Sequence, residues 1–528
     1  MNYIPERIEV PAWISCRTYL FGKPDSRTYI SNEKNHKYVM LDGLASDMWQ
    51  LLYDRVSESD FTVWVKNNGV EKEVDGFLRE LVEQELITVS DKNEAEREKT
   101  TAYEPFGADS ESDAEAKFIE EMQAWLFEKK FMSSLFFELT YRCNLKCVHC
   151  YNPKNMPEVE LDFDLCKKAI DDAYELGCFR ITFSGGEATL HSRFIELVRY
   201  ARSKHISVEI FTNGQILAEN DRLYREMLAL YPYRVCVSLY GTTKQTHECV
   251  TSVDGSFEKS KDLIFRLRKE NVNVQIKNFL LNLNCRECLN VKKMAADIGA
   301  TSVADISLIP TIEGDKKTFR YMLDEKTLFG LYIDSESPLY VGTDYKHLDY
   351  EKRKNDSPCF GGFSGLCVNP DGEVVICVSM PLSVGNLKKT TLKEIWQAAA
   401  EKNPDSKLYR WQEVRIADFG ECHKEEYCAF CDFCPGMGYL ENGFLKKSDV
   451  LCMQAKTKMK AYKYLKMKSE FYKRLHLFLK SMLEKIVGKA NAISSDSNDF
   501  FKKIEELSDD LQHLSDHAVH EIEDLSAD

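Results

Sequence analysis

The chain has 528 residues, of which 44% are hydrophobic and 11% aromatic, so it has enough apolar side chains for several buried cores. Its formal net charge of −15 argues against nucleic acid as a partner, because phosphate binding needs a local surplus of Lys and Arg. The N-terminus has no basic region followed by an apolar run, and no segment reaches the ~18 to 20 apolar residues of a membrane span. We therefore expect a cytoplasmic protein that binds neither nucleic acid nor a membrane.

Residues 1–92 are predicted to form a small winged-helix-like domain. A short apolar strand begins at Tyr38, and three segments with apolar residues at helical spacing follow it. Residues 87–89 would then return as a strand. The three helices are marked by Trp49, Phe61 and Phe77.

Residues 93–130 are predicted to form a linker and a helix. The stretch from 91 to 113 is rich in Glu, Lys, Thr, Ser and Asp, which is the composition of a solvated linker. A domain boundary is therefore expected there. An amphipathic helix should follow around residues 118–127.

Residues 131–345 alternate strand and helix patterns. Repeated βα units of this length predict an α/β fold with a parallel sheet, open or closed as a partial barrel, and a functional site at the carboxyl ends of the strands. After a first strand that runs into a cysteine motif, the strand candidates are residues 180–183, 208–211, 235–239, 274–279 and 306–309. Helical patterns between them include residues 194–204 and 257–270.

Two further regions complete the chain. Residues 346–455 are compact, with turn signals and eight closely spaced cysteines, and residues 456–528 are predicted to be a charged helical extension. Residues 456–489 carry 11 Lys or Arg against two Glu, whereas residues 496–528 carry 11 Asp or Glu against two Lys. These two segments would pair as an antiparallel hairpin or form a solvated helical appendage.

The cysteines point to metal ligation, because eighteen of them in a reducing compartment would not form a disulfide framework. Cys143, Cys147 and Cys150 have the spacing C-x3-C-x2-C on a loop after the first barrel strand. Three thiolates can hold three irons of a four-iron cube and leave the fourth without a protein ligand. The alternative is a zinc half-site, but nothing nearby supplies the matched second pair of ligands.

This loop resembles the signature of the radical S-adenosylmethionine (SAM) superfamily, which implies a partial (β/α)6 barrel. In that family the open iron chelates SAM, and an electron passed through the cluster breaks a carbon–sulfur bond to release a 5′-deoxyadenosyl radical. The resemblance continues in Ser184-Gly-Gly-Glu187, in Thr212-Asn-Gly214 and in Ser238-Leu-Tyr-Gly241, each after a strand. It implies that SAM is bound by Gly185, Gly186, Glu187, Asn213 and Ser238.

The second cysteine region resembles the SPASM domain found behind radical SAM barrels in peptide-modifying enzymes. It shares the Asn369-Pro-Asp-Gly turn, the Gly385-Asn-Leu segment and Cys434-Pro-Gly. The usual run C-x2-C-x5-C-x3-C stands here as C-x5-C-x2-C-x2-C, which leaves the total intact. The family pattern implies two closed four-iron clusters, one held by Cys359, Cys367, Cys377 and Cys434 and the other by Cys422, Cys428, Cys431 and Cys452.

The cysteine count agrees with three four-iron clusters, because three ligands plus two sets of four require eleven cysteines. The two regions supply three and eight. The remaining seven lie in helix- or strand-like contexts where a free cysteine is usually a small buried apolar group. They are Cys16, Cys166, Cys178, Cys236, Cys249, Cys285 and Cys288, and only the last two form an ambiguous C-x2-C pair.

The N-terminal domain resembles the peptide-recognition element of ribosomal peptide maturases, on Tyr38-Val-Met-Leu-Asp, the Trp49 helix and Phe77-Leu. In that family a leader peptide adds a strand to an exposed sheet edge. The alternative is a domain that only stabilises the chain or binds another protein. Together the resemblances imply a maturase of the sactipeptide or ranthipeptide type, which joins a cysteine sulfur to an unactivated carbon of a precursor peptide and needs an electron donor such as flavodoxin or ferredoxin.

The sequence leaves three alternative functions. The same machinery could form a carbon–carbon or carbon–oxygen crosslink between side chains. Sulfatase maturation is disfavoured, because Val378 follows Cys377 where the resembling enzymes carry Asp. An electron-transfer or scaffold protein with three clusters is a non-enzymatic alternative, although a pure carrier would fill every iron site. The sequence identifies no catalytic acid or base.

Overall fold

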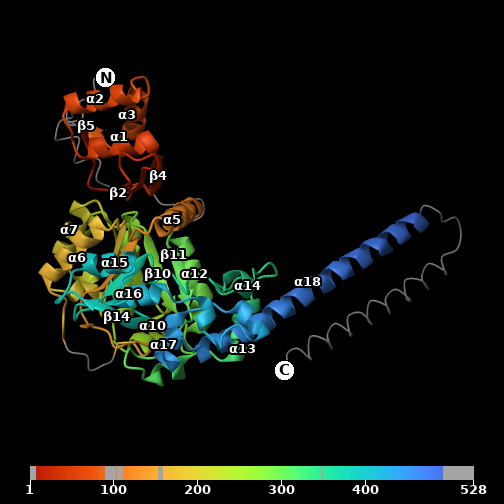
Figure 1. The fold of residues 1–528 in the computed structure, drawn as a ribbon. Helices are drawn as coiled ribbons and strands as arrows, with labels where there is room; N and C mark the ends of the chain where they lie inside the picture. Colours follow the sequence, from red (N-terminus) through yellow and green to blue (C-terminus); the bar gives the residue numbers. More distant parts are fainter. Residues whose placement is uncertain (1–7, 90–102, 104–110, 153–157, 347–348, 491–528) are drawn as a thin grey trace. The chain divides into compact units, whose positions relative to one another are not determined.

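The computed structural model describes residues 8–89, 103, 111–152, 158–346 and 349–490 (Figure 1). The chain divides into two compact units. The first comprises Met1–Leu323, Lys352–Glu421 and Phe433–Asp449, and the second comprises Asp324–Glu351, Cys422–Asp432 and Val450–Asp528. Most of the predicted linker, residues 91–113, lies outside the described residues.

The first unit begins with a three-stranded antiparallel sheet that carries three helices. Its strands, in the order β2-β3-β4, are β2 (Ile14–Tyr19), β3 (Arg27–Asn32) and β4 (Lys37–Asp42). The helices are α1 (Gly43–Tyr53), α2 (Glu58–Asn68) and α3 (Val74–Glu83), and β1 (Ile8–Glu9) pairs with β5 (Thr88–Val89) in a separate ribbon. The predicted strand at Tyr38, the three helices and the returning strand are confirmed, whereas β1, β2 and β3 were not predicted. We call residues 8–89 the N-terminal module.

Both faces of this sheet are buried, because its side chains alternate between two cores. Ile14 and Ile30 point to one face and pack with Trp49 of α1. Tyr19 and Tyr29 point to the other face, where they pack against helix α5 (Glu111–Glu128) and the barrel. The sheet is therefore sandwiched between its own helices and the rest of the first unit.

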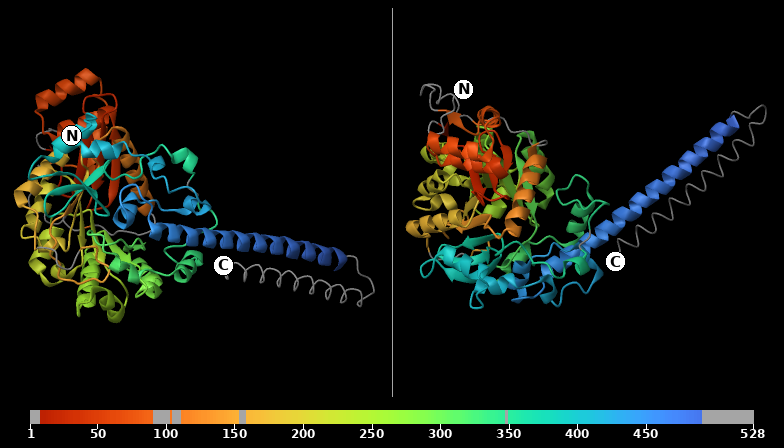
Figure 2. Two further views of the ribbon diagram at one scale, coloured as in Figure 1. Left: turned by 60° about the horizontal axis from the view of Figure 1, so that its bottom comes forward. Right: turned by 45° about the horizontal axis from the view of Figure 1, so that its top comes forward.

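The barrel is a run of six parallel strands whose order in space follows the sequence. They are β6 (Ser134–Glu138), β7 (Arg180–Ser184), β8 (Ser207–Thr212), β9 (Arg234–Ser238), β10 (Val274–Phe279) and β11 (Thr301–Asp305). Helices α6 (Phe163–Glu175), α7 (Phe194–Ser203), α8 (Gln215–Glu219), α9 (Asp221–Leu228), α10 (Lys244–Thr251), α11 (Ser256–Lys269) and α12 (Cys288–Asp297) lie on the connections (Figure 2). This is the partial (β/α)6 barrel that the sequence predicts.

One strand prediction is wrong. The sixth strand was expected at residues 306–309, but β11 ends at Asp305. The apolar residues that suggested a strand there serve another purpose, because Leu308 is buried in a cluster beside Cys147 and Val148 of the cysteine loop. Apolar content alone does not separate a strand from a loop that packs inward.

The barrel sheet continues into the cysteine-rich region. Strand β12 (Gly365–Val368) pairs in parallel with β6, so Cys367 lies opposite Phe136. Strands β13 (Glu373–Cys377) and β14 (Met380–Asn386) then extend the sheet in antiparallel fashion to nine strands. Helices α15 (Leu392–Ala400), α16 (Lys407–Gln412) and α17 (Pro435–Asn442) complete this part of the first unit.

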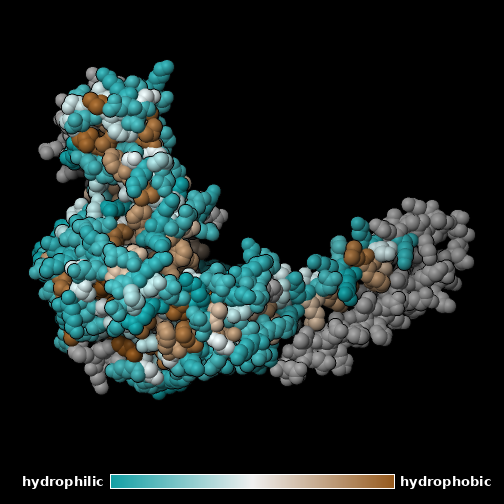
Figure 3. Space-filling view, viewed as in Figure 1, coloured by the Kyte–Doolittle hydropathy of each residue, from teal (hydrophilic) through white to brown (hydrophobic). Residues whose placement is uncertain are grey.

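The second unit contains α13 (Glu325–Ile333) and most of the long helix α18 (Asp449–Ala490), and α14 (Tyr350–Arg353) lies at the boundary between the units. Its small core includes Phe430, whose ring packs against Tyr345 and Tyr462. Residues 456–489 are helical as predicted, and α18 exposes Tyr472 and Leu477 on a largely hydrophilic surface (Figure 3). The acidic segment 496–528, and with it the predicted hairpin, lies outside the described residues. No helix among the described residues is both long and apolar enough to cross a membrane.

A buried charge pair fastens the N-terminal module to the barrel. The guanidinium of Arg202 in α7 donates hydrogen bonds to the carbonyl oxygens of Ala12 (2.6 Å) and Ile14 (3.3 Å) and to Ser15 Oγ (2.5 Å). Ser15 donates in turn to the carboxylate of Glu33, which is 1% exposed. Burial raises the pKa of Glu33, and the nearby Arg202 opposes that rise. The module is thus held in one fixed position within the first unit.

Removal of this cation should loosen the junction. Arg202→Met would leave Glu33 buried without its counter-charge, and we expect a loss of about 3–5 kcal/mol in the free energy of unfolding, measured by chemical denaturation with hydrogen exchange of β2 as a local probe. Arg199→Met is the matched control, because Arg199 forms an exposed ion pair with Glu226 worth at most about 1 kcal/mol. Equal losses in the two variants would contradict the assigned role.

Candidate active site

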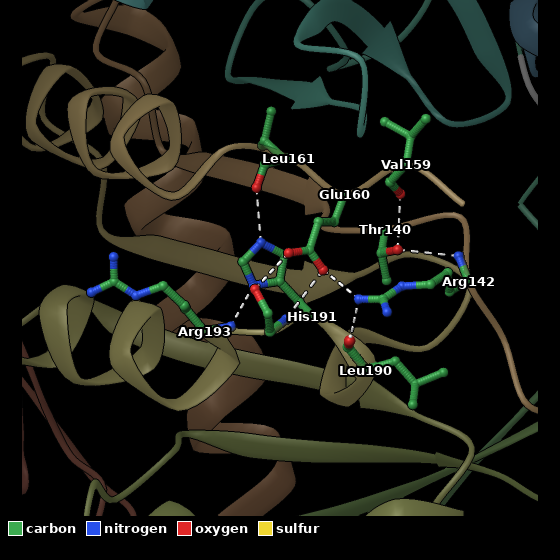
Figure 4. Close-up of polar contacts among 9 residues, drawn as sticks. Thr140, Arg142, Val159, Glu160, Leu161, Leu190, His191 and Arg193 are labelled. Carbon is green, nitrogen blue, oxygen red and sulfur yellow. Dashed lines mark hydrogen bonds and ion pairs between the residues drawn. The ribbon is translucent and has the colours of Figure 1, made fainter. Parts of the chain in front are cut away.

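The cysteine loop follows β6 and is anchored on the next strand connection (Figure 4). Thr140 donates its hydroxyl to the Val159 carbonyl at 2.9 Å and accepts the backbone N–H of Arg142. The Arg142 guanidinium donates to the carboxylate of Glu160 and to the Leu190 carbonyl, the latter at 2.7 Å. These contacts fix the backbone just before the first cysteine.

The side chain of His191 connects the same two segments of the barrel through further hydrogen bonds. His191 donates Nε2–H to the Leu161 carbonyl at 2.8 Å and accepts the backbone N–H of Arg193 at Nδ1 (Figure 4). Glu160 also accepts hydrogen bonds from the backbone and hydroxyl of Ser192. The loop is therefore held by side chains from two successive connections of the barrel.

The three predicted thiols of this loop lie close together. Cys143 and Cys147 each interact electrostatically with Cys150, and with one another. Burial raises the pKa of Cys143 to about 11 and that of Cys147 further. Cys143 Sγ accepts N–H groups from Leu145 at 3.4 Å and from Asn213 Nδ2 at 3.7 Å. Donors of this kind tune and orient metal-bound sulfur.

The Gly-Gly turn packs directly on the cysteine loop. A Cβ on Gly185 would lie 2.6 Å from the Thr140 carbonyl oxygen, and one on Gly186 would lie 2.4 Å from that of Arg142. Gly185 also has φ +138, a backbone conformation that L side chains rarely adopt. The family resemblance implies glycine here for close approach to SAM, and the contacts with the cysteine loop require glycine independently.

Glu187 joins the ends of β7 and β8. Its carboxylate is 2% exposed and accepts hydrogen bonds from the backbone and hydroxyl of Thr189, the hydroxyl of Thr212 and the backbone of Asn213. Oε1 accepts three of these bonds, whereas Oε2 accepts one, from Asn213 at 2.7 Å. Burial raises the pKa of Glu187 despite these donors. Oε2 retains capacity for a further donor such as an ammonium group.

Asn213 contacts the cysteine loop directly, whereas Ser238 is connected to it through Tyr240. Asn213 donates to Asn144 Oδ1 at 2.7 Å. Ser238 interacts with Tyr240, which in turn interacts with Cys147. All five predicted SAM-binding residues lie at the carboxyl ends of β7, β8 and β9, and Ser238 is the last residue of β9.

The structure brings the eight remaining predicted ligands together in two groups, each inside one unit. In the first unit, Cys359 and Cys377 interact with each other and with Cys434, and Cys377 interacts with Cys367. Cys434 is the N-cap of α17, where the helix dipole favours a thiolate. In the second unit, Cys431 interacts with Cys422, Cys428 and Cys452. These groups coincide with the two predicted sets despite the altered spacing.

Thiolates are the usual ligands of iron–sulfur clusters, so the donor sets of three, four and four fit three such groups. Among the described residues, no three His, Cys, Asp or Glu side chains converge as the ligands of a single metal ion do. A cube binds each thiolate to a different iron and therefore tolerates a wider spacing. Of the other seven cysteines, six are buried as expected, whereas Cys249 is exposed on α10.

Several residues beside these cysteines were missed by the sequence argument. His149 stacks on Phe279 with ring centroids 5.0 Å apart and meets Tyr240 edge-on, which makes an aromatic wall beside Cys147. Glu138 ends β6 and accepts a hydrogen bond from Tyr151 at 2.5 Å. A carboxylate at the end of the apolar run of β6 was the signal that could have identified Glu138.

Comparisons with known proteins agree with this site. Residues 137–284 match the radical SAM superfamily, and residues 359–435 match the iron–sulfur cluster-binding SPASM domain. The chain is therefore a radical SAM enzyme. More particularly, it is a radical SAM enzyme with a SPASM domain, and its cofactors are SAM and iron–sulfur clusters.

Two relatives and one solved structure illustrate the range of the match. The chain is 27% identical to the AdoMet-dependent heme synthase of Methanosarcina barkeri, over 60% of this chain and 95% of that protein. It is 26% identical to the antilisterial bacteriocin subtilosin biosynthesis protein AlbA of Bacillus subtilis, over 61% of this chain and 70% of that protein. Streptococcus suis SuiB bound to its precursor peptide SuiA is a structural match with a TM-score of 0.49 and 14% identity, over 84% of this chain and 99% of that one.

The remaining acceptor capacity of Glu187 Oε2 generates a prediction. Glu187→Ala should weaken SAM binding by about 1.5–3 kcal/mol, because a charge-assisted hydrogen bond is lost. Isothermal titration of the cluster-loaded protein measures this change. Glu196→Ala is the control, since Glu196 lies on α7 and pairs with Arg193 at the surface. Unchanged SAM affinity in Glu187→Ala would remove the role assigned to that carboxylate.

Proposed function

We propose that this enzyme modifies a ribosomally made precursor peptide by forming a thioether between a cysteine sulfur and an unactivated carbon. The leader of the precursor binds residues 1–92, and the residues to be modified reach the barrel, residues 131–345. SAM and its cluster, when bound, supply a carbon-centred radical that removes a hydrogen atom from an unreactive carbon. In this proposal, residues 346–455 are the domain that holds the two closed clusters. Residues 93–130 link the N-terminal domain to the barrel, and residues 456–528 form the helical extension.

No strand among the described residues pairs with the outer edge of β4, and this open edge is the observation that carries the proposal. On β2, Cys16 donates its backbone N–H outward to the His205 carbonyl at 3.0 Å, and the Ile14 carbonyl accepts from His205 and Arg202. The barrel therefore covers the β2 edge. Hydrogen bonds alternate along antiparallel strands, which leaves the backbone groups of Met40 facing away from β3. An extended peptide can add to that edge through backbone hydrogen bonds.

The match to the heme synthase favours a second class of reaction, but that match covers only part of this chain. That protein is covered over 95% of its length by only 60% of this chain. Two fifths of this chain therefore lie outside the match, so the match does not account for the whole chain. The relative named for the biosynthesis of the bacteriocin subtilosin supports a peptide substrate.

Several finer points belong to the same proposal. The SAM-binding cluster is held by Cys143, Cys147 and Cys150, and SAM contacts come from the five residues already described. Electrons come from a small donor protein such as flavodoxin or ferredoxin. Among the described residues, which include all eighteen cysteines, no disulfide bond is formed, and this supports a reducing, cytoplasmic location.

The cluster assignment predicts an iron content. Anaerobically reconstituted protein should hold about twelve iron and twelve sulfide per chain, as three four-iron cubes require. The triple variant Cys143→Ala, Cys147→Ala, Cys150→Ala should lose about one third of the iron and all SAM cleavage. The exposed Cys249→Ala is the matched control and should keep full iron. Full iron in the triple variant would contradict the assignment.

The β4 edge predicts a selective effect of proline. Met40→Pro removes one outward N–H and leaves the hydrogen bonds between β3 and β4 intact. The binding free energy of the precursor, measured by fluorescence anisotropy, should therefore weaken by about 0.5–1.5 kcal/mol. Met40→Ala keeps the N–H and is the control for the side chain. A point variant tests the β4 edge more specifically than deletion of residues 1–92, because the deletion would also remove the hydrogen-bond partners of Arg202. Equal precursor affinity in Met40→Pro and the parent enzyme would place the leader elsewhere.

A further inference from the structure

Glu138 projects into the interior of the barrel at its functional end. Its neighbour Phe137 points the other way, because Phe137 is fully buried and stacks on Phe183, which meets Phe194 of helix α7. Side chains alternate along a strand, so Phe136 and Glu138 face the interior. Phe136 meets Phe211 of β8 there, at 5.8 Å between ring centroids. Glu138 is the last residue of β6 and lies at the carboxyl end, where barrels of this kind place their chemistry.

The carboxylate of Glu138 is buried without a cation. It is 6% exposed, and its one described hydrogen bond comes from the hydroxyl of Tyr151. The titratable groups that interact with it are Tyr151 and Cys367, with Tyr141 on the same loop, and none of these is basic. Within the described part of the chain, no Lys, Arg or His forms an ion pair with Glu138.

Two other carboxylates of the barrel, the buried Glu187 and the partly buried Glu209, are compensated. Glu187 accepts four hydrogen bonds, as described above. Glu209 accepts the Thr182 hydroxyl at 3.1 Å and lies 3.7 Å from the guanidinium of Arg234. A buried carboxylate that lacks such partners is unfavourable for stability, and groups of this kind concentrate at functional sites.

The surroundings of Glu138 connect two of the proposed cluster sites. Tyr151 follows Cys150 of the cysteine loop and interacts electrostatically with Cys150 and Cys367. Cys367 lies opposite Phe136 in the β6–β12 pairing, two residues before the position of Glu138. A peptide side chain that reaches the barrel interior between the first and the second cysteine group therefore passes this carboxylate.

We propose that Glu138, oriented by Tyr151, is the base that takes the proton from the substrate thiol as the new carbon–sulfur bond forms. This inference rests on the proposed function. The acceptor carbon loses a hydrogen atom to the SAM-derived radical, the thiol loses its proton to Glu138, and the carbon–sulfur bond forms. The one electron in surplus passes to an oxidised iron–sulfur cluster, which is the oxidant of the step. Glu138 contacts the reacting sulfur in this scheme, whereas Tyr151 is a positioning residue.

The protonation chemistry of this carboxyl suits the task. Burial raises the pKa of Glu138 to about 7, and the Tyr151 hydrogen bond lowers it in part. A base with a pKa near the working pH is ionised for much of the time and still retains the proton that it accepts. The yield of thioether per SAM cleaved should accordingly rise as the pH increases through 7.

The test compares Glu138→Gln with Tyr151→Phe and with the matched control Glu209→Gln, all as cluster-loaded full-length enzyme with a cysteine-containing precursor. In Glu138→Gln, thioether formation should fall on the order of 100-fold, while SAM cleavage without peptide and precursor affinity stay at the parent level. Tyr151→Phe should shift the pH midpoint of the yield upward, because the pKa-lowering hydrogen bond is gone. Glu209→Gln should retain the parent yield.

A readout independent of activity is infrared difference spectroscopy of the parent enzyme against Glu138→Gln, which should show a carboxylic acid band that disappears as the pH rises through about 7. Absence of that band, an unchanged thioether yield, or loss of peptide-free SAM cleavage in Glu138→Gln would each overturn the inference. Failure of the proposed function looks different, because the parent enzyme itself would then give no peptide product.

Discussion

The pairing of β6 with β12 is the constraint on which the rest of this architecture depends. Strand β6 opens the barrel and leads into the cysteine loop, and the same strand receives β12 of the cysteine-rich region along its outer edge. Backbone hydrogen bonds thereby fix Cys367 two residues away from Glu138 in register. Because a strand register moves only in whole residues, and a slip by one residue turns every side chain to the opposite face, this distance is tightly set. Two cysteine groups are thus held on one rigid sheet rather than on independent domains.

Much of this arrangement is predictable from the sequence, because cluster binding fixes how closely the ligand cysteines must be spaced. Cysteines that hold one cluster must lie close together, so their distribution along the chain indicates the first loop and the later region before any fold is known. The Gly-Gly-Glu turn is equally constrained, since Gly186 lies too close to the Arg142 carbonyl for any side chain. The amphipathic helices of the N-terminal module were likewise readable from their apolar periodicity.

Other features depend on contacts between distant residues and leave little local signal. Strands β2 and β3 carry polar and aromatic residues on the face that meets the barrel, so they show no clean alternation of apolar and polar positions. The sixth barrel strand was placed too late, because Leu308 is buried as part of a loop. Glu138 was missed since its burial depends on Tyr151 and on the β12 pairing. The grouping of the later cysteines in two separate units was also beyond a count of ligands.

The proposed function separates peptide recognition from chemistry. Arg202 and Glu33 lock the N-terminal module to α7, so the open edge of β4 keeps a constant relation to the barrel within the first unit. A leader bound there provides affinity that does not depend on the residues being modified, which leaves those residues free to vary. The interior of the barrel then needs only to orient one carbon and one sulfur, and Glu138 is the polar group placed to act on the latter.

The central claim is that this enzyme forms a thioether in a peptide, and the mass of that peptide tests it most directly. A short cysteine-containing reading frame, if one is found beside this gene, is the candidate precursor to co-express with the enzyme and analyse by high-resolution mass spectrometry after alkylation. The account predicts a product lighter by two hydrogen atoms per crosslink, in which the joined cysteine resists alkylation. A precursor of unchanged mass with every cysteine alkylated, from an enzyme that still cleaves SAM, would contradict it.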